Sequence, residues 1–223
     1  MRSIFEGRES DSPYIHMIWR GHTAKNYVAT CPAEPRWNLF LIKQQDQVKV
    51  SVEGPLSQAK YKFRRDESDF LVIKFRLGTF FPYLPVTNLV NTDAPLPEGT
   101  RKSFWLNGST WELPTFENVE TFVDRLVRED VLRLDPVVDS VLQNQPQDVS
   151  DRTVRRRFIH TTGLTPKALQ QIERAQQAAT LLGQGGSILD TVFAAGYADQ
   201  PHLTRSLKRF YGQTPAQIAN QQS

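Results

Sequence analysis

Leu203-Thr-Arg-Ser-Leu207, separated by four residues from Gly212-Gln-Thr-Pro215, repeats a pattern that stands 49 residues earlier as Val154-Arg-Arg-Arg-Phe158 and Gly163-Leu-Thr-Pro166. In both copies a central arginine lies between two apolar residues, and glycine, threonine and proline follow at the same spacing. Glycine is common just past the end of a helix, and threonine followed by proline is a typical helix start. The pattern therefore predicts one structural unit that occurs twice: a helix, a glycine stop and the beginning of the next helix.

Each repeated helix also has its own start signal. Ser150 and Asp199 stand four residues before the first apolar residue of the two copies, and both residue types cap helix N-termini. The second copy is preceded by Ser187-Ile-Leu-Asp190, which resembles a capping box with aspartate in place of glutamate, and by the tight turn Ala195-Gly-Tyr197. A short helix, a glycine turn and a basic helix follow one another in a helix-turn-helix.

The repeated helices have one apolar and one basic side. At 100° per residue, Leu203, Leu207 and Phe210 lie within about 60° of one another and predict a buried stripe. The candidate DNA-contacting residues on the opposite sides are Arg152, Thr153, Arg155, Arg156 and His160 in the first copy and His202, Arg205, Lys208 and Arg209 in the second. Arg157 lies nearer the apolar side and is expected to be structural or directed at phosphate. A solvated charged face is the alternative, but arginines on a rigid helix suit guanine edges and phosphates.

A long helix is predicted between the two units. It begins at Thr165-Pro166 and ends at the glycines of Gly183-Gln-Gly-Gly186, which resemble a phosphate loop but follow a helix and lack the Gly-Lys-Ser/Thr ending. About 18 residues at roughly 1.5 Å each give a length of about 27 Å. The two recognition helices would then lie about one DNA turn apart, roughly 34 Å. One chain could read two successive major-groove segments without dimerising.

The distribution of charge supports a polyanionic partner. The chain has 223 residues and a net charge of +3, but residues 150–223 hold nine Lys or Arg against four acids. Residues 1–149 therefore have a net charge of −2. The apolar runs are far too short to cross a bilayer, no secretory signal is visible, and one cysteine excludes an intramolecular disulfide. A soluble intracellular protein with a basic binding module is expected.

Residues 150–218 resemble the tandem helix-turn-helix DNA-binding domain of AraC/XylS-type transcriptional regulators, and Ala195–Pro215 is similar to the signature stretch of that family. The resemblance implies a cytoplasmic bacterial regulator that is not an enzyme and has no cofactor, with recognition helices at about 151–160 and 200–210. The base contacts that it implies fall to Arg152, Arg155, Arg156, Gln200, Thr204 and Arg205. The implied partners are double-stranded promoter DNA, RNA polymerase and a small-molecule effector, with no membrane; monomer and homodimer both remain open.

Two positions depart from the pattern of that family. Gln147 stands where the second copy has Gly196, so either the first unit lacks a positioning helix or Asp135–Leu142 takes its place. Pro201 stands where the family has a small polar residue, and its nitrogen has no hydrogen to donate.

The first 117 residues follow a different pattern. Strands are predicted over 14–19, 37–42, 48–52 and 70–75, which are rich in β-branched and aromatic residues. The region resembles the cupin-like sensor domains fused to such regulators. We therefore expect an α+β protein, with a β-rich sensor domain at 1–117, a connecting helix within 118–134, and at 135–223 an all-α domain whose two helix-turn-helix units are joined by a long helix.

Other candidate sites in the first half of the chain are weak. His16 and His22 lack a third ligand, so no metal site is predicted, and Cys31 is expected to be inert. Phe80-Phe-Pro-Tyr83 could line an effector pocket, although packing in the core is the favoured interpretation. Two alternative functions remain: a cupin-like enzyme with an accessory DNA-binding domain, and a non-specific architectural DNA-binding protein.

Overall fold

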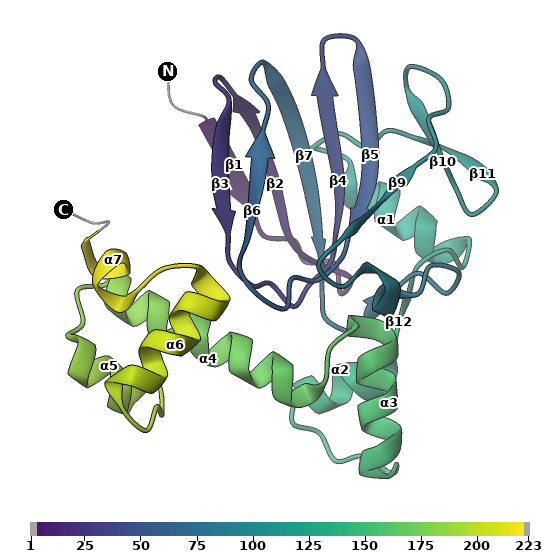
Figure 1. The fold of residues 1–223 in the computed structure, drawn as a ribbon. Helices are drawn as coiled ribbons and strands as arrows, with labels where there is room; N and C mark the ends of the chain where they lie inside the picture. Colours follow the sequence, from purple (N-terminus) through teal and green to yellow (C-terminus); the bar gives the residue numbers. More distant parts are fainter. Residues whose placement is uncertain (1–3, 221–223) are drawn as a thin grey trace.

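A computed structural model describes residues 4–220, in which a β-rich N-terminal domain precedes a helical C-terminal domain (Figure 1). The N-terminal domain contains a six-stranded antiparallel sheet. In spatial order its strands are β1 (Ile4–Arg8), β2 (Ile15–Thr23), β7 (Ser68–Phe75), β4 (Asn38–Gln44), β5 (Gln47–Glu53) and β9 (Asp93–Leu96). The expected α+β class, with a β-rich domain ahead of an all-α one, is confirmed.

One face of this sheet forms the N-terminal core. Alternate residues such as Leu39 in β4 and Ile73 in β7 are fully buried against helix α1 (Val119–Arg128). The hairpin of β10 (Ser103–Leu106) and β11 (Ser109–Glu112) closes the same core. The helix expected to connect the domains therefore packs onto the sheet. The four predicted strands overlap the four central strands β2, β4, β5 and β7.

The other face of the sheet is partly covered by an antiparallel pair of strands that the sequence patterns did not predict. This pair, the β3–β6 ribbon, consists of β3 (Tyr27–Cys31) and β6 (Lys60–Arg64). Strand β3 follows β2 after residues 24–26, and β6 leads into β7 through residues 65–67. The ribbon therefore continues the β2–β7 pair and bends back over the sheet. In Figure 1 it lies in front of β1 and β2.

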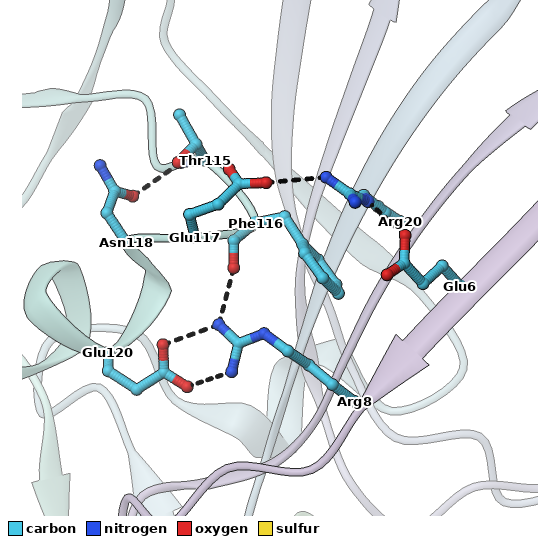
Figure 2. Close-up of polar contacts among 8 residues, drawn as sticks. All are labelled: Glu6, Arg8, Arg20, Thr115, Phe116, Glu117, Asn118 and Glu120. Atoms are coloured by element: carbon cyan, nitrogen blue, oxygen red, sulfur yellow. Dashed lines mark hydrogen bonds and ion pairs between the residues drawn. The ribbon is translucent and has the colours of Figure 1, made fainter.

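Arginine–carboxylate contacts tie α1 to the first two strands (Figure 2). Arg8 of β1 donates to both carboxylate oxygens of Glu120, at 2.8 Å for Oε2. Arg20 of β2 donates to Glu6 at 2.7 Å and to Glu117 at 2.8 Å. The hydrogen bond from Arg8 lowers the pKa of Glu120 to about 2 although burial opposes it. The edge of the sheet and the start of α1 are therefore held together by charge-assisted bonds.

The C-terminal domain contains the predicted succession of helices. They are α2 (Pro136–Leu142), α3 (Asp151–Thr162), α4 (Pro166–Gly183), α5 (Ile188–Ala194), α6 (Gln200–Tyr211) and α7 (Pro215–Ala219). Each begins after a side chain that accepts a hydrogen bond from a backbone N–H of its first turn, and these caps are Asp135, Ser150, Thr165, Ser187, Asp199 and Thr214. Short elements complete the chain: β8 (Thr79–Phe80), the 3-10 helix η1 (Val86–Leu89) and β12 (Arg133–Leu134).

The capping box expected at α5 was wrong in one detail. The Ser187 hydroxyl accepts from the Asp190 N–H at 3.1 Å, but it also donates to Asp190 Oδ2 at 2.6 Å. Aspartate is one methylene shorter than glutamate, and here it bonds the serine hydroxyl where a glutamate would bond the serine N–H. A complete capping box forms at α7, between Thr214 and Gln217.

Two apolar clusters join the domains. The C-terminal core surrounds α4, with Ile172 and Leu182 packed against residues of α6 such as Leu207, and it includes Ala33 from the N-terminal domain. A smaller cluster joins Leu77 to Val138, Phe158 and Leu169. Among the helices formed by residues 4–220, none is both long and apolar enough to span a membrane.

Candidate nucleic-acid interface

The second helix-turn-helix unit consists of α5 and α6. Its turn contains Gly196, whose φ of +68° is in the left-handed region that favours glycine. The N–H groups of Gly196 and Tyr197 donate to the carbonyls of Phe193 and Val192 at 3.1 and 2.8 Å, which closes the end of α5. Tyr197 is buried, and its hydroxyl lies 2.8 Å from that of Ser206 in α6. The turn therefore sets the direction in which α6 leaves.

Helix α6 exposes a basic side, as its sequence predicts. Leu203, Leu207 and Phe210 are buried, while Gln200, Arg205, Lys208 and Arg209 are exposed. Thr204 is half-buried, and so is His202, whose ring packs edge-on against Tyr197 with 5.1 Å between centroids. Within residues 4–220, the three cations of α6 have no carboxylate partner. Their charge is available to an external anion.

The first unit consists of α2 and α3, so Asp135–Leu142 provides the positioning helix. The turn residue is Asn144, with φ of +55°, and not Gln147. The N–H groups of Asn144 and Gln145 donate to the carbonyls of Val141 and Ser140 at 3.0 and 2.9 Å, the arrangement seen around Gly196. The connection to the next cap is three residues longer than in the second unit. This insertion explains why the alignment of the two copies placed the turn at Gln147.

Helix α3 presents the arginines predicted to contact DNA. Arg152, Arg155 and Arg156 are exposed and Thr153 is half-buried. These four residues and Ile159 line a shallow hollow of about 380 Å³ on the outer side of the helix. Arg157 instead bonds Asp135 at 3.0 Å, a structural contact and one of the two roles considered for it. None of the three exposed arginines pairs with a carboxylate in the described part of the chain.

Both recognition helices are anchored to the N-terminal domain, which the sequence did not reveal. At the end of α6, the carbonyls of Arg209 and Phe210 accept from the N–H groups of Ala59 and Ala33 at 2.8 and 2.7 Å. At the end of α3, the ring of His160 packs against Phe80 with 5.2 Å between centroids. One side of this ring is therefore covered by the N-terminal domain. Helix α4, 18 residues long, runs between the two units (Figure 1).

A compact group of charges lies at the contact between the domains, away from the exposed cations. Glu34 is bonded by Lys74 at 2.5 Å and by Arg36 at 3.2 Å. Burial raises the pKa of Glu34, but the two cations outweigh it, so this pKa lies below its usual value. Burial and the charge of Glu34 raise the pKa of Tyr211 at the end of α6. One carboxylate here pairs with two cations, so Lys74 and Arg36 are both held by Glu34 and the group keeps one net positive charge.

The remaining candidates of the N-terminal half lie apart from one another. His22 pairs with Asp69 at 2.9 Å, and His16 is exposed elsewhere on β2. No group of three or more His, Cys, Asp or Glu side chains suited to a metal ion occurs among residues 4–220. Phe81 is buried in the N-terminal core, as the packing interpretation of Phe80–Tyr83 predicts.

A pocket of about 400 Å³ lies between the β3–β6 ribbon and the sheet. Its walls include Phe5, Trp19, Phe40 and Phe70 from the sheet. The sequence does not reveal this pocket, because the pocket depends on β3 and β6, which the residue patterns do not predict. It is the N-terminal feature best suited in size and character to a small molecule.

Comparison with known proteins bears on the C-terminal domain. Residues 147–221 match the family described as a helix-turn-helix domain. The resemblance to AraC-type regulators is thereby confirmed for this segment, which is the DNA-binding domain of a transcriptional regulator. No curated protein matches the chain.

Two solved structures to which the chain is similar are those of ToxT from Vibrio cholerae. One has 10% sequence identity and a TM-score of 0.40, over 96% of this chain and 97% of that chain. The other, ToxT bound to (E)-4-(8-methylnaphthalen-1-yl)but-3-enoic acid, has 10% identity and a TM-score of 0.41, over 96% and 98%.

Proposed function

We propose that the protein is a cytoplasmic, sequence-specific transcriptional regulator that reads two adjacent major-groove segments with α3 and α6. The observation that carries this proposal is the pair of helices that expose unpaired cations. Arg152, Arg155 and Arg156 of α3 and Arg205, Lys208 and Arg209 of α6 have no carboxylate partner within residues 4–220. Phe158 anchors α3 in the interior, and a buried apolar stripe anchors α6. An α-helix fits the major groove, where arginine bonds the guanine edge and lysine contacts phosphate. Because one chain carries both helices, recognition of two segments needs no second protomer.

Different roles are assigned to the exposed residues of the two helices. We assign base contacts to Arg152, Arg155 and Arg156 in α3 and to Gln200, Thr204 and Arg205 in α6. Lys208 and Arg209, nearer the end of α6, are assigned to phosphate, with Thr153 and His202 as flanking contacts. His202 is the least available of these residues, because its ring already packs on Tyr197.

The N-terminal domain is proposed to regulate this activity through a small-molecule effector. The pocket under the β3–β6 ribbon supports the proposal, since its volume of about 400 Å³ lies in the usual range for such ligands. In this proposal residues 1–117 form the sensor, α1 connects the domains within 118–134, and residues 135–223 form the DNA-binding domain.

Selection from a random pool of double-stranded DNA tests the proposal. The full chain is expected to enrich a motif with two parts about one helical turn apart. Arg205→Ala should weaken binding to the selected site by about 1–3 kcal/mol and relax one base position, whereas Lys208→Ala should weaken all sequences alike and reduce the salt slope by about one. Arg128→Ala, an exposed arginine of α1, is the control and should bind as the parent does.

Two results would contradict the proposal. If Arg205→Ala binds the selected site as tightly as the parent, the role of α6 in reading bases is wrong. If no motif is enriched, the protein is a non-specific architectural DNA-binding protein.

A further inference from the structure

The β3–β6 ribbon connects the pocket to the recognition helix α6. At one end its two bends are joined by a hydrogen bond of 3.0 Å from the Asp66 N–H to Asn26 Oδ1. Just beyond its other end, the N–H groups of Ala33 and Ala59 donate to carbonyls in the last turn of α6. The ribbon is therefore attached to the sheet at one end and to the DNA-binding domain at the other.

The contact at the far end is tight. A Cβ atom added to Gly212, which ends α6, would lie 3.2 Å from Thr30 Cγ2 and 3.4 Å from Ala59 Cβ. The last carbonyls of a helix lack partners within the helix, so the two N–H groups of the ribbon satisfy groups that would otherwise need water. A displacement of the ribbon must therefore move the end of α6 or break these bonds.

The pocket lies under this ribbon and is largely apolar. Its sheet side exposes aromatic surface, with 52% of Phe5 and 38% of Trp19 accessible to solvent. Large apolar side chains in that state mark binding surfaces in soluble proteins. On the ribbon side the wall is formed by residues such as Ala29 and Arg64.

Two arginines line the pocket, Arg64 and Arg65, and Arg64 is the half-buried one. In the ribbon register Arg64 lies opposite Tyr27, so the two side chains share the face that lines the pocket, and the guanidinium lies 5.4 Å from the ring centroid of Phe40. Lys62, the next residue on that face, is neutralised by Glu53 at 2.8 Å. Arg64 has no carboxylate partner within residues 4–220. Its guanidinium donates only to Cys31 Sγ among the described side chains, at 4.0 Å. A half-buried guanidinium among aromatic rings is a strong site for an anion.

We propose that this pocket binds a small molecule with an apolar body and one anionic group paired to Arg64, and that the β3–β6 ribbon transmits its occupancy to α6. The effect on DNA rests on the function proposed above, whereas the ligand class does not. The aromatic walls bind the body, Arg64 selects for the charge, and the ribbon moves as the space beneath it fills. Occupancy thus changes the placement of α6 through backbone bonds.

The ligand class is tested with two fluorescent probes that differ by one sulfonate. The full chain is titrated with 1-anilinonaphthalene-8-sulfonate and with the neutral N-phenyl-1-naphthylamine. Arg64→Met is expected to weaken the anionic probe at least tenfold and the neutral probe less than twofold. Ala29→Phe, which fills the pocket, should weaken both, and Arg128→Met should change neither. Equal binding of the anionic probe by Arg64→Met and the parent would overturn the proposal.

The coupling is tested by measuring the Kd for the selected DNA with and without saturating anionic probe. We expect a change of at least threefold in the parent. Ala59→Pro, which lacks one N–H donor to α6, should still bind the probe but lose this change. Hydrogen exchange of the unmodified chain gives an independent measurement, in which the probe should alter exchange at the amides of 207–212.

Binding of the ligand and its coupling to DNA can fail independently. An unchanged Kd together with unchanged exchange at 207–212 overturns the coupling. DNA binding without any probe tests the proposed function by itself, and the probe titrations do not depend on it.

Discussion

Replacing Asp135 by alanine tests how the first helix-turn-helix unit is held together. Asp135 is 6% exposed, and its carboxylate accepts from the N–H groups of Val137 and Val138 at 3.0 and 3.1 Å. It also bonds Arg157 of α3 at 3.0 Å, so one side chain both starts α2 and ties it to the recognition helix. Its loss should therefore weaken both elements.

The size of the effect follows from these contacts. Loss of the cap costs about 1 kcal/mol, and the buried Val138 N–H left without a partner adds about another 1 kcal/mol. The Arg157 side chain is 41% exposed, so its ion pair adds at most about 1 kcal/mol. We expect Asp135→Ala to lower the free energy of unfolding by about 2–3 kcal/mol.

Urea unfolding followed by circular dichroism measures this loss. Asp135→Asn retains an oxygen that can cap α2 and should lose about 1 kcal/mol or less. The matched variant Arg157→Met keeps the cap and removes the pair, and it should resemble Asp135→Asn. If Asp135→Ala unfolds within about 0.5 kcal/mol of the parent, this account of the first unit is wrong.

Three further substitutions probe the turns and the sheet edge. Gly163→Ala should destabilise by about 2–4 kcal/mol in urea, because its φ is +69° and the new Cβ would lie 2.7 Å from Val90 Cγ2; Gly196→Ala, at a φ of +68° in open space, should lose about 1–2 kcal/mol. Similar losses for the two would contradict the role of crowding. Because the hydrogen bond from Arg8 lowers the pKa of Glu120 to about 2 in the folded state, this carboxylate stabilises the fold above its ordinary pKa of 4.5, and the contribution disappears as the pH falls from about 4.5 to 2. Acid unfolding should therefore show Glu120→Gln less stable than the parent at pH 7 and equal to it near pH 2, and a constant difference across that range would refute the assignment.

The helical half of the fold was predictable because the residues that start and end its helices lie next to them in the sequence. Ser150, Thr165 and Asp199 cap the helices that they precede, and Gly163 and Gly212 adopt the left-handed conformation just past the ends of α3 and α6. Each of these signals acts over a few residues, so periodicity and capping residues suffice to locate the helices. The same holds for Arg205, whose exposure follows from the apolar stripe opposite it.

The β3–β6 ribbon was not predictable, because its pattern is inverted. Lys60, Lys62 and Arg64 alternate with Tyr61 and Phe63, and such a strand is expected to turn its aromatic side inward. In the structure Tyr61 and Phe63 are exposed, whereas Lys62 and Arg64 contact residues of the sheet. Partners distant in the sequence decide this arrangement, such as Glu53 for Lys62 and the phenyl ring of Phe40 for Arg64.

The first turn was missed for a different reason. Asn144 performs the task of Gly196, since asparagine tolerates positive φ more readily than most residues. The insertion of three residues before Ser150 shifts it out of register with the second copy. A search for glycine at the equivalent position therefore finds Gln147, and the spacing alone cannot show where the extra residues lie.

The position of Ala33 inside the core of the neighbouring domain limits how this protein can be recombined. A chimaera that grafted residues 135–223 onto a foreign sensor would leave a void beside α4 and two helix carbonyls without donors, unless the new sensor carried an equivalent loop. Exchange of sensors between such regulators therefore requires the transplanted module to include the surface that docks on α6. A cut placed between residues 118 and 134 alone would yield a poorly packed hybrid.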